Sequence, residues 1–313
     1  MCFSLSAQKI IDLSGKWSFS IDRQDNGEKE KWFSHTLNDF INLPGSMPEK
    51  LKGDEVTAKT QWTGSLYDSS YYYNPYMEKY RKEGNIKFPF FLTPDKHYVG
   101  AAWYQKEVNI PADWKGERIL LFLERPHIET TVWVNGQKTG MQNSLCVPHQ
   151  YDITRYVRPG KCTITIRVDN RIKEINVGPD SHSITDQTQG NWNGIVGRIC
   201  LQTTPKTYFD DIQIYPEPEQ KLARVKVVIK GTGTAKVKLS AESFNTDKKH
   251  IVPAIQQEIK LNKGVTETEM VLPMGNDMLL WDEFHPALYK LKAEVTNGKK
   301  TEIKEIQFGM RRI

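Results

Sequence analysis

The hydrophobic and polar residues of this chain alternate over many short stretches, as they do in strands that bury one face. Residues 161–168 place Ile164, Ile166 and Val168 on one face, and residues 225–229 repeat the alternation. Helical periodicity is scarce in comparison. The pattern therefore predicts an all-β protein whose strands pack as two-layer sandwiches or jelly rolls.

Turn signals separate these stretches. Asn135-Gly136 follows a strand-like run, and both residue types tolerate the positive φ angles of a type I′ hairpin turn. A last hairpin is predicted at Asn297-Gly298. The pair Asn74-Pro75 has the composition of a helix start, with asparagine as the cap and proline in the first turn, so we expect a short helix there.

A domain boundary is predicted near residues 203–205 (TTP). A new strand-like run begins at Tyr208, and the proline-rich breaker PEPE follows at residues 216–219. Residues 9–205 then form a larger sandwich. Residues 206–313 form a smaller one, whose size is that of an immunoglobulin-like domain.

Composition and charge exclude several classes of partner. The chain has 313 residues and a formal net charge of +5, with its 43 basic and 38 acidic side chains interspersed. We interpret this as a solvated surface and predict no nucleic-acid partner. No run approaches the ~20 apolar residues of a membrane span, so no membrane partner is predicted. The cysteines and histidines lack metal-ligand spacing, and we predict neither a metal nor a cofactor.

The N-terminus resembles the end of a secretory signal. Residues 1–8 (MCFSLSAQ) are mostly small or apolar, and Ala7 precedes a polar residue. Because a basic start is missing, these residues would be the remnant of a longer leader. An ordinary frayed terminus is the alternative. A signal remnant predicts a periplasmic or secreted protein.

Residues 53–98 interrupt the strand pattern and contain 11 aromatic residues. Long segments without regular structure are uncommon and often functional. Trp62, Tyr73 and Tyr98 are candidates for an aromatic rim around the mouth of an active site. The alternative is a self-packed cover over one face of the sandwich, because each buried ring removes ~150–250 Å² from water.

Six segments of the first region occur in a familiar order. They are GAAWYQK (100–106), IPADWKGER (110–118), VWVNG (132–136), YDIT (151–154), RPG (158–160) and VDNR (168–171). In this order they resemble the N-terminal jelly-roll sugar-binding domain of glycoside hydrolase family 2, which includes β-galactosidases, β-glucuronidases and β-mannosidases. The segments LWDEFHPALY (280–289) and FGMR (308–311) resemble the immunoglobulin-like domain of that family. The resemblance implies a jelly-roll sandwich followed by an immunoglobulin-like sandwich.

The resemblance also implies where the chemistry of such enzymes lies. The family's two catalytic carboxylates, ~5–5.5 Å apart, are carried by a (β/α)₈ barrel of ~250 residues. That barrel would have to follow Ile313. No pair of acids in the printed sequence can be nominated in its place, so we name no catalytic residue. We expect the chain to be inactive alone, although it resembles a β-galactosidase-like hydrolase.

A polar loop ahead of the run GIVGR is the candidate sugar contact. Asp186, Gln187 and Asn191 offer planar donors and acceptors for vicinal hydroxyls, and Trp192 offers a flat face for a pyranose ring. In the resembling family, an acid eight residues before the glycine of a similar strand start reaches the terminal sugar, and Asp186 has that spacing from Gly194. The alternatives are that Asp186 caps a turn and that Trp192 is buried in the sandwich.

Three functions stay open at this point. The first is the non-catalytic N-terminal portion of an exo-β-glycosidase, whose sandwiches shape the carbohydrate pocket beside a missing or separately encoded barrel. The second is a free-standing carbohydrate-binding module. The third is a structural or adhesion protein for which sugar is irrelevant. A homo-oligomer is compatible with each.

Overall fold

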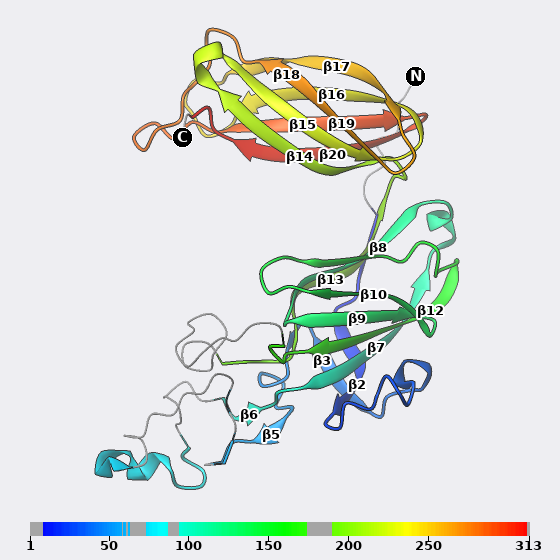
Figure 1. Ribbon diagram of the computed structural model, residues 1–313, viewed down its shortest axis with the longest axis vertical. Coiled ribbons are helices and arrows are strands. Elements are labelled where there is room, and N and C mark those ends of the chain that lie inside the picture. Colours follow the sequence, from blue (N-terminus) through cyan, green and yellow to red (C-terminus); the bar gives the residue numbers. More distant parts are fainter. Residues whose placement is uncertain are drawn as a thin grey trace. The chain divides into compact units, whose positions relative to one another are not determined.

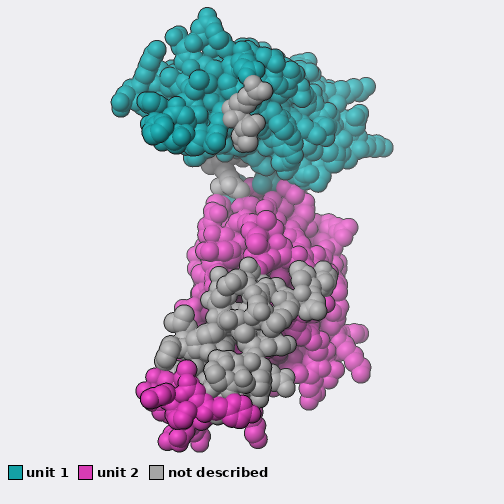
Figure 2. Space-filling view, turned by 60° about the vertical axis from the view of Figure 1, so that its left-hand side comes forward, with its two compact units in different colours: residues 1–9, 204–313 teal, residues 10–203 magenta. Residues whose placement is uncertain are grey.

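The computed structural model describes residues 9–57, 59–60, 62, 73–86, 94–173 and 190–311. The chain divides into two compact units, one formed by residues 10–203 and the other containing the chain from residue 204 onward (Figure 2). The predicted leader remnant, residues 1–8, lies outside the described residues.

The first unit is a sandwich of two sheets (Figure 1). The five-stranded sheet has the order β1-β13-β8-β11, and β4 pairs with the start of β13. Its strands are β1 (Ile10–Asp12), β4 (Gly45–Ser46), β8 (Arg118–Pro126), β11 (His149–Asp152) and β13 (Gly194–Thr204).

The six-stranded sheet has the order β10-β9-β12-β7-β2-β3. Its strands are β2 (Gly15–Asp22), β3 (Asp39–Leu43), β7 (Ala101–Ile110), β9 (Glu129–Val134), β10 (Gln137–Asn143) and β12 (Gly160–Asp169). Ile164, Ile166 and Val168 of β12 are fully buried in the core between the sheets, as their alternation predicted.

The outer face of the six-stranded sheet is covered as well. Trp103 and Trp133 lie with ring centroids 4.9 Å apart, and Phe33 stacks on Trp133 at 5.2 Å. Leu37 belongs to the same cluster. Because the segment after β2 supplies this cover, β7 is buried on both faces where it begins. Its first four residues, AAWY, are therefore all buried without alternation.

A two-stranded sheet closes the base of the aromatic insert. Its strands are β5 (Asp54–Glu55) and β6 (Lys96–His97), with Asp54 opposite His97 and Glu55 opposite Lys96. The pairing brings together residues about forty positions apart in the chain. It gives the two ends of the insert a fixed position beside the first sandwich.

The helices among the described residues are short 3₁₀ segments: η1 (Trp32–Ser34), η2 (Pro75–Tyr80), η3 (Ala112–Trp114) and η4 (Pro218–Gln220). The helix predicted at Asn74-Pro75 is confirmed, since the Asn74 side chain accepts a hydrogen bond from the Tyr76 amide at 2.9 Å. In this described part of the chain, no helix has the length and apolar character needed to cross a membrane.

The second unit is a seven-stranded sandwich of immunoglobulin-like build. A three-stranded sheet, β14-β15-β18, packs against a four-stranded sheet, β17-β16-β19-β20. The strands are β14 (Tyr208–Glu217), β15 (Leu222–Lys230), β16 (Gly233–Ser243), β17 (Ile251–Leu261), β18 (Val265–Pro273), β19 (Tyr289–Asn297) and β20 (Lys300–Phe308). Val225, Val227 and Ile229 are fully buried. The prediction of an all-β chain with an immunoglobulin-like second sandwich is confirmed.

Both predicted hairpins form, but with different turns. Asn135 and Gly136 have φ angles of 50° and 76° and join β9 to β10 as the two central residues of the turn. In the last hairpin Asn297 pairs with Lys300, so the central residues are Gly298 and Lys299. Only Gly298 has a positive φ there, which is the requirement of a type II′ turn.

Candidate functional site

The candidate site lies at the end of the first sandwich where β7 begins, β12 ends and β13 begins. Asp169 pairs with Ala101 at the end of the β12–β7 ladder. The residues just outside the strands continue this contact, because the Gly100 carbonyl accepts from the Asn170 amide at 3.4 Å and from the Asn193 side chain at 2.9 Å. The segments before β7, after β12 and before β13 therefore meet at one edge of the fold.

Two buried asparagines connect these segments. The Asn170 side chain accepts from the Gly100 amide at 2.8 Å and donates to the Tyr98 carbonyl at 2.8 Å and to the Asn191 side chain at 3.0 Å. Asn191 donates in return to the Asn170 carbonyl at 3.1 Å. Asn191 is only 4% exposed. Asn191, a predicted site residue, thus lies at this edge with its side-chain amide bound to Asn170. Its contact with sugar stays a prediction.

Asn193 fixes the start of β13 in the same way. Its side chain accepts from the Tyr104 hydroxyl at 2.7 Å and donates to the carbonyls of Gly100 and Val168, each at 2.9 Å. Burial raises the pKa of Tyr104 well above its ordinary value, so the hydroxyl keeps its proton and donates. Buried amides with such complete hydrogen bonding hold backbone segments in one arrangement.

Trp192 is half-buried and stacks on His127. The ring centroids lie 4.6 Å apart with 25° between the planes, and His127 Nδ1 lies 2.8 Å from the Trp192 carbonyl oxygen. Burial lowers the pKa of His127 to about 4, and hydrogen bonds to backbone groups oppose this only partly. The imidazole is therefore neutral near pH 7, and the stack gives Trp192 a fixed orientation. One indole face contacts His127.

An ion-pair cluster surrounds the end of β12. The Asp169 carboxylate is fully buried and accepts from Arg171 at 2.6 Å, from Lys173 at 2.8 Å and from Arg167 at 3.0 Å. Asp25 and Glu129 supply two further acids to the same three cations. Burial alone would raise the pKa of Asp169, but the hydrogen bonds from Arg171 and Lys173 outweigh it and hold that pKa well below its usual range.

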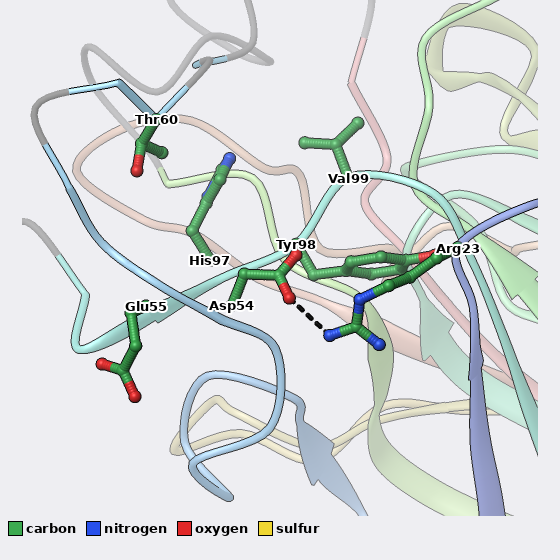
Figure 3. Close-up of a pocket in the computed structure, with 7 residues that line it drawn as sticks. All are labelled: Arg23, Asp54, Glu55, Thr60, His97, Tyr98 and Val99. Carbon is green, nitrogen blue, oxygen red and sulfur yellow. Dashed lines mark hydrogen bonds and ion pairs between the residues drawn. The ribbon is translucent and has the colours of Figure 1, made fainter.

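A pocket of about 400 Å³ opens at the base of the insert (Figure 3). Its lining consists of Arg23, Asp54, Glu55, Thr60, His97, Tyr98 and Val99. Two ion pairs belong to it, one between Arg23 and Asp54 and one between Lys96 and Glu55. Tyr98 joins the pocket to the amide network, because its carbonyl accepts from Asn170.

The three predicted rim aromatics differ in their burial. Tyr98 is 6% exposed and donates its hydroxyl to the Ala101 carbonyl at 2.9 Å, so its ring is buried, and its place in an aromatic rim stays a prediction. Tyr73 is 80% exposed. Trp62 is half-buried, with its ring centroid 4.6 Å from that of His97, a residue of the pocket. Of the three candidates, Tyr98 lines the pocket, and Trp62 contacts His97, which also lines it.

Two predicted sugar contacts, Asp186 and Gln187, lie outside the described residues. Sequence reasoning also missed the residues that build the pocket, above all Arg23, Asp54 and His97. These positions are far apart in the chain and belong to no motif. Asn170 belongs to the segment VDNR, and Asn191 belongs to the polar loop ahead of GIVGR, so the sequence contained signals for part of the amide network.

The pocket carboxylates are not arranged as a glycosidase pair. Asp54 and Glu55 are neighbours in β5, where successive side chains point to opposite faces. Figure 3 shows Asp54 directed toward Arg23 and Glu55 directed away from it. Each is ion-paired with a different cation. Among the residues that the structure describes, no group of three or more His, Cys, Asp or Glu side chains could hold a metal ion.

Fold and site together define a two-sandwich β protein with a polar pocket at one end of the first sandwich. Comparison with protein families gives collinear matches to both sandwiches. The model "Glycosyl hydrolases family 2, sugar binding domain" matches residues 10–205, and "Glycosyl hydrolases family 2" matches residues 207–311. The chain belongs to glycoside hydrolase family 2.

Similar proteins are longer than this chain. Human "Beta-glucuronidase" is 24% identical over 93% of the chain and 42% of its own length. "Beta-galactosidase large subunit" of Lactobacillus acidophilus is 22% identical over 96% of the chain and 46% of its own length. The chain thus spans about half the length of the curated relatives it matches.

Solved structures share the fold. A β-glucuronidase from Ruminococcus gnavus in complex with C6-substituted uronic isofagomine has a TM-score of 0.64 at 18% identity. The match covers 98% of this chain and 46% of that one. An uncultured Clostridium β-glucuronidase has a TM-score of 0.61 at 20% identity over 99% of this chain.

Proposed function

We propose that this chain is the non-catalytic front portion of an exo-acting β-glycosidase of family 2. The observation that carries the proposal is the collinear match of both sandwiches to family 2 models, together with relatives that extend to about twice its length. The named relatives are β-glucuronidases and β-galactosidases, so hydrolysis of an O-glycosyl bond is the activity proposed for the complete enzyme.

The role proposed for the first sandwich is to shape the sugar pocket. A (β/α)₈ barrel presents its catalytic carboxylates at one open face. A sandwich beside that face would narrow the opening so that one terminal sugar fits. The edge with Asn191 and Trp192 is a suitable wall, because its amide network and its indole–imidazole stack are rigid. We propose Trp192 and the segment that contains Asp186 and Gln187 as the groups that approach the sugar.

Activity of the 313-residue chain tests this proposal. We expect no hydrolysis of nitrophenyl β-galactoside, β-glucuronide or β-mannoside above the buffer rate. Turnover that persists through several purification steps would contradict it. Reading the coding sequence beyond Ile313 tests it from the other side, because a (β/α)₈ barrel is expected there or in a neighbouring gene.

In the enzyme completed by that barrel, Trp192→Ala tests the pocket-shaping role. We expect at least a tenfold rise in KM, because the indole would lose contact with the terminal sugar. The matched control is Trp281→Ala, which changes a half-buried tryptophan of the second sandwich. Equal effects of the two substitutions would contradict a special role for the Trp192 edge.

The pocket lined by Arg23, Asp54 and His97 favours one alternative, a free-standing carbohydrate-binding module. That function predicts measurable sugar affinity of the chain in the absence of any barrel. A structural or adhesion role predicts none. Titration of the 313-residue chain with saccharides separates the two.

Export to the periplasm or the medium is a further part of the proposal, supported by the composition of residues 1–8. Cell fractionation and N-terminal sequencing of the native protein test it. Recovery of the intact protein in the cytoplasm with Met1 retained would contradict it.

A further inference from the structure

Four connections of the chain meet at one end of the second sandwich, as the registers of its two sheets show. They are the segment that enters β14 and the turns β15–β16, β17–β18 and β19–β20, formed by residues 205–207 (PKT), 231–232 (GT), 262–264 (NKG) and 298–299 (GK). All four connections are described, and they contain lysines but no acidic residue. Together with the first residue of β20, these lysines are Lys206, Lys263, Lys299 and Lys300. This end of the sandwich is therefore basic.

The acidic side chains that follow these connections in β14 and β20 are engaged within the strands. The Asp210 carboxylate pairs with Lys230 at 2.9 Å, and the Glu302 carboxylate accepts from the Phe209 backbone amide at 2.6 Å. Neither contact involves a lysine of the connections. The positive charge of the connections is therefore the feature that a ligand at this end would meet.

A second pocket, of about 500 Å³, lies among the connections. Its volume falls within the ~300–1,000 Å³ typical of small-molecule sites. All of its lining belongs to the second compact unit. The lining residues are Pro205, Lys206, Thr207, Gly231, Thr232, Asn297 and Lys300.

The Asn297 side chain holds three walls of this pocket together. Its amide donates to the Thr207 hydroxyl oxygen at 3.0 Å and to the Thr232 carbonyl at 2.8 Å. The turn that contains Gly231 also packs closely, because a Cβ atom there would lie 2.6 Å from the Thr207 hydroxyl oxygen. The walls are thus fixed by contacts between segments that are far apart in the chain.

The lining favours a negatively charged ligand. It contains two ammonium groups, from Lys206 and Lys300, and no carboxylate. In the pocket of the first sandwich, by contrast, the cation Arg23 is paired with Asp54. A lysine ammonium binds phosphate as a compact point charge. The exposed Thr232 adds a hydroxyl, which can donate a hydrogen bond to an oxyanion.

We infer that this pocket binds a small molecule through a phosphate or sulfate group. Lys206 and Lys300 contact the oxyanion, and the Thr232 hydroxyl donates to it. Asn297 is a positioning residue, since both of its N–H groups are already bound to the pocket walls. The inference is independent of the proposed function, because it rests on residues 205–300 alone.

Calorimetric titration of the 313-residue chain at low ionic strength tests the inference. The probes are inorganic phosphate, sulfate and acetate. We expect phosphate or sulfate to bind with a dissociation constant on the order of 1 mM, since so small an ion makes few contacts. Acetate, with a single charge, should bind at least fivefold more weakly. Added sodium chloride should weaken the binding, because the lysines are exposed and their charges are screened.

Lys206→Gln gives the sharpest readout. The side chain is exposed, so its replacement should leave the fold unchanged, which thermal unfolding without added anion checks. We expect phosphate and sulfate to bind at least fivefold more weakly to this variant. Lys300→Gln should have an effect of similar size. Thr232→Val keeps the shape of the side chain but removes the hydroxyl, and it should weaken binding at least twofold.

Lys263→Gln is the matched control. Lys263 is exposed and belongs to the same end of the sandwich, but it does not line the pocket. We expect its anion affinities to equal those of the unchanged chain. The inference is overturned if neither phosphate nor sulfate binds, or if acetate binds as tightly as they do. It is also overturned if Lys263→Gln weakens binding as much as Lys206→Gln, because the attraction would then belong to the whole basic end and to no particular pocket.

These outcomes are distinct from those of the proposed function. Absence of anion binding removes the pocket assignment and leaves the family 2 front portion intact. Hydrolysis of glycosides by the isolated chain removes the non-catalytic role and leaves the anion-binding data unaffected.

Discussion

The two sandwiches bury their strands in different ways. In the second sandwich the burial of successive residues alternates regularly along the long strands. In β15, half-buried and buried residues alternate over the whole length of the strand. Its buried polar residues are three hydroxyl side chains, Thr207, Ser243 and Thr266, among those described. In the first sandwich the described buried residues include charged and amide side chains, among them Arg167, Asp169, Asn170, Asn191 and Asn193.

This difference distinguishes the first sandwich by its closely fixed buried polar groups. Buried charges and amides cost free energy unless each is paired, so a fold keeps them where a fixed geometry is useful. In the first sandwich they gather at the edge that also carries the pocket and Trp192. The second sandwich follows the simplest rule for a β-sandwich, and its buried polar residues among those described include no charged or amide side chain.

The largest effect is expected from Asp169→Asn. The substitution leaves Arg167, Arg171 and Lys173 in a half-buried cluster without their central carboxylate. Breaking a buried ion pair in this way typically costs about 4 kcal/mol. Hydrogen exchange by mass spectrometry on the whole chain should show lost protection in β7 and β12 only. Glu107→Gln, an exposed ion pair on the same sheet, should cost less than about 0.5 kcal/mol. Similar losses for both would contradict the prediction.

A slightly smaller loss is expected from Leu291→Ala in the second sandwich. Leu291 is fully buried in the core of β19, and the cavity left by its side chain should cost about 3 kcal/mol. Hydrogen exchange should now be faster in β15, β16 and β19, while β7 and β12 keep their protection. Equal loss in both sandwiches would show that the two units unfold as one, and the comparison between them would lose its meaning.

The free energy of unfolding of the first sandwich should depend on pH through His127. Its pKa is about 4 when folded, against an ordinary value of 6.5, because burial disfavours the charged ring. The unfolded chain therefore binds more protons between these values, so stability is complete above pH 6.5 and falls as pH drops toward 4. The loss at pH 5 should be about 2 kcal/mol.

Urea unfolding followed by tryptophan fluorescence at pH 7, 6 and 5 measures this loss. Of the eight tryptophans, only Trp281 lies beyond residue 203, so the signal reports mainly on the first sandwich. His127→Gln should reduce the dependence in this range without abolishing it, because burial also lowers the pKa of His149 in the same sandwich. An equally steep dependence in that variant would assign the effect to other groups.

The strand pattern was predictable from sequence wherever one face of a strand is buried. Ile164, Ile166, Val225 and Val227 were placed correctly, because period-two alternation follows directly from the pleat. The helix start at Asn74 was also predictable, because a helix cap is a contact between near neighbours in the chain. These features need no knowledge of distant contacts.

The site was less predictable because its contacts are long-range. Asn193 and Gly100 are 93 residues apart, and His127 and Trp192 are 65 apart. Arg23 and Asp54 meet only because β2 ends near the pair β5–β6. The aromatic-rich segment that contains Tyr98 carries no sign of the hydrogen bond from its hydroxyl to Ala101. The residue type made Asn191 a candidate for polar contacts. It did not show that the side-chain amide of Asn191 is bound to Asn170.

The smallest effect compares the two hairpin turns, one in each sandwich. Gly136 and Gly298 have φ angles of 76° and 60°, and a methyl group added at either would meet no atom within 4 Å. The cost of alanine at each position therefore comes from the backbone alone, about 1 kcal/mol. Urea unfolding of Gly136→Ala and Gly298→Ala measures both. Equal costs would show that the two turns, although of different types, make the same demand on their glycine. A cost at Gly136 of several kcal/mol would instead extend the difference to the strand connections.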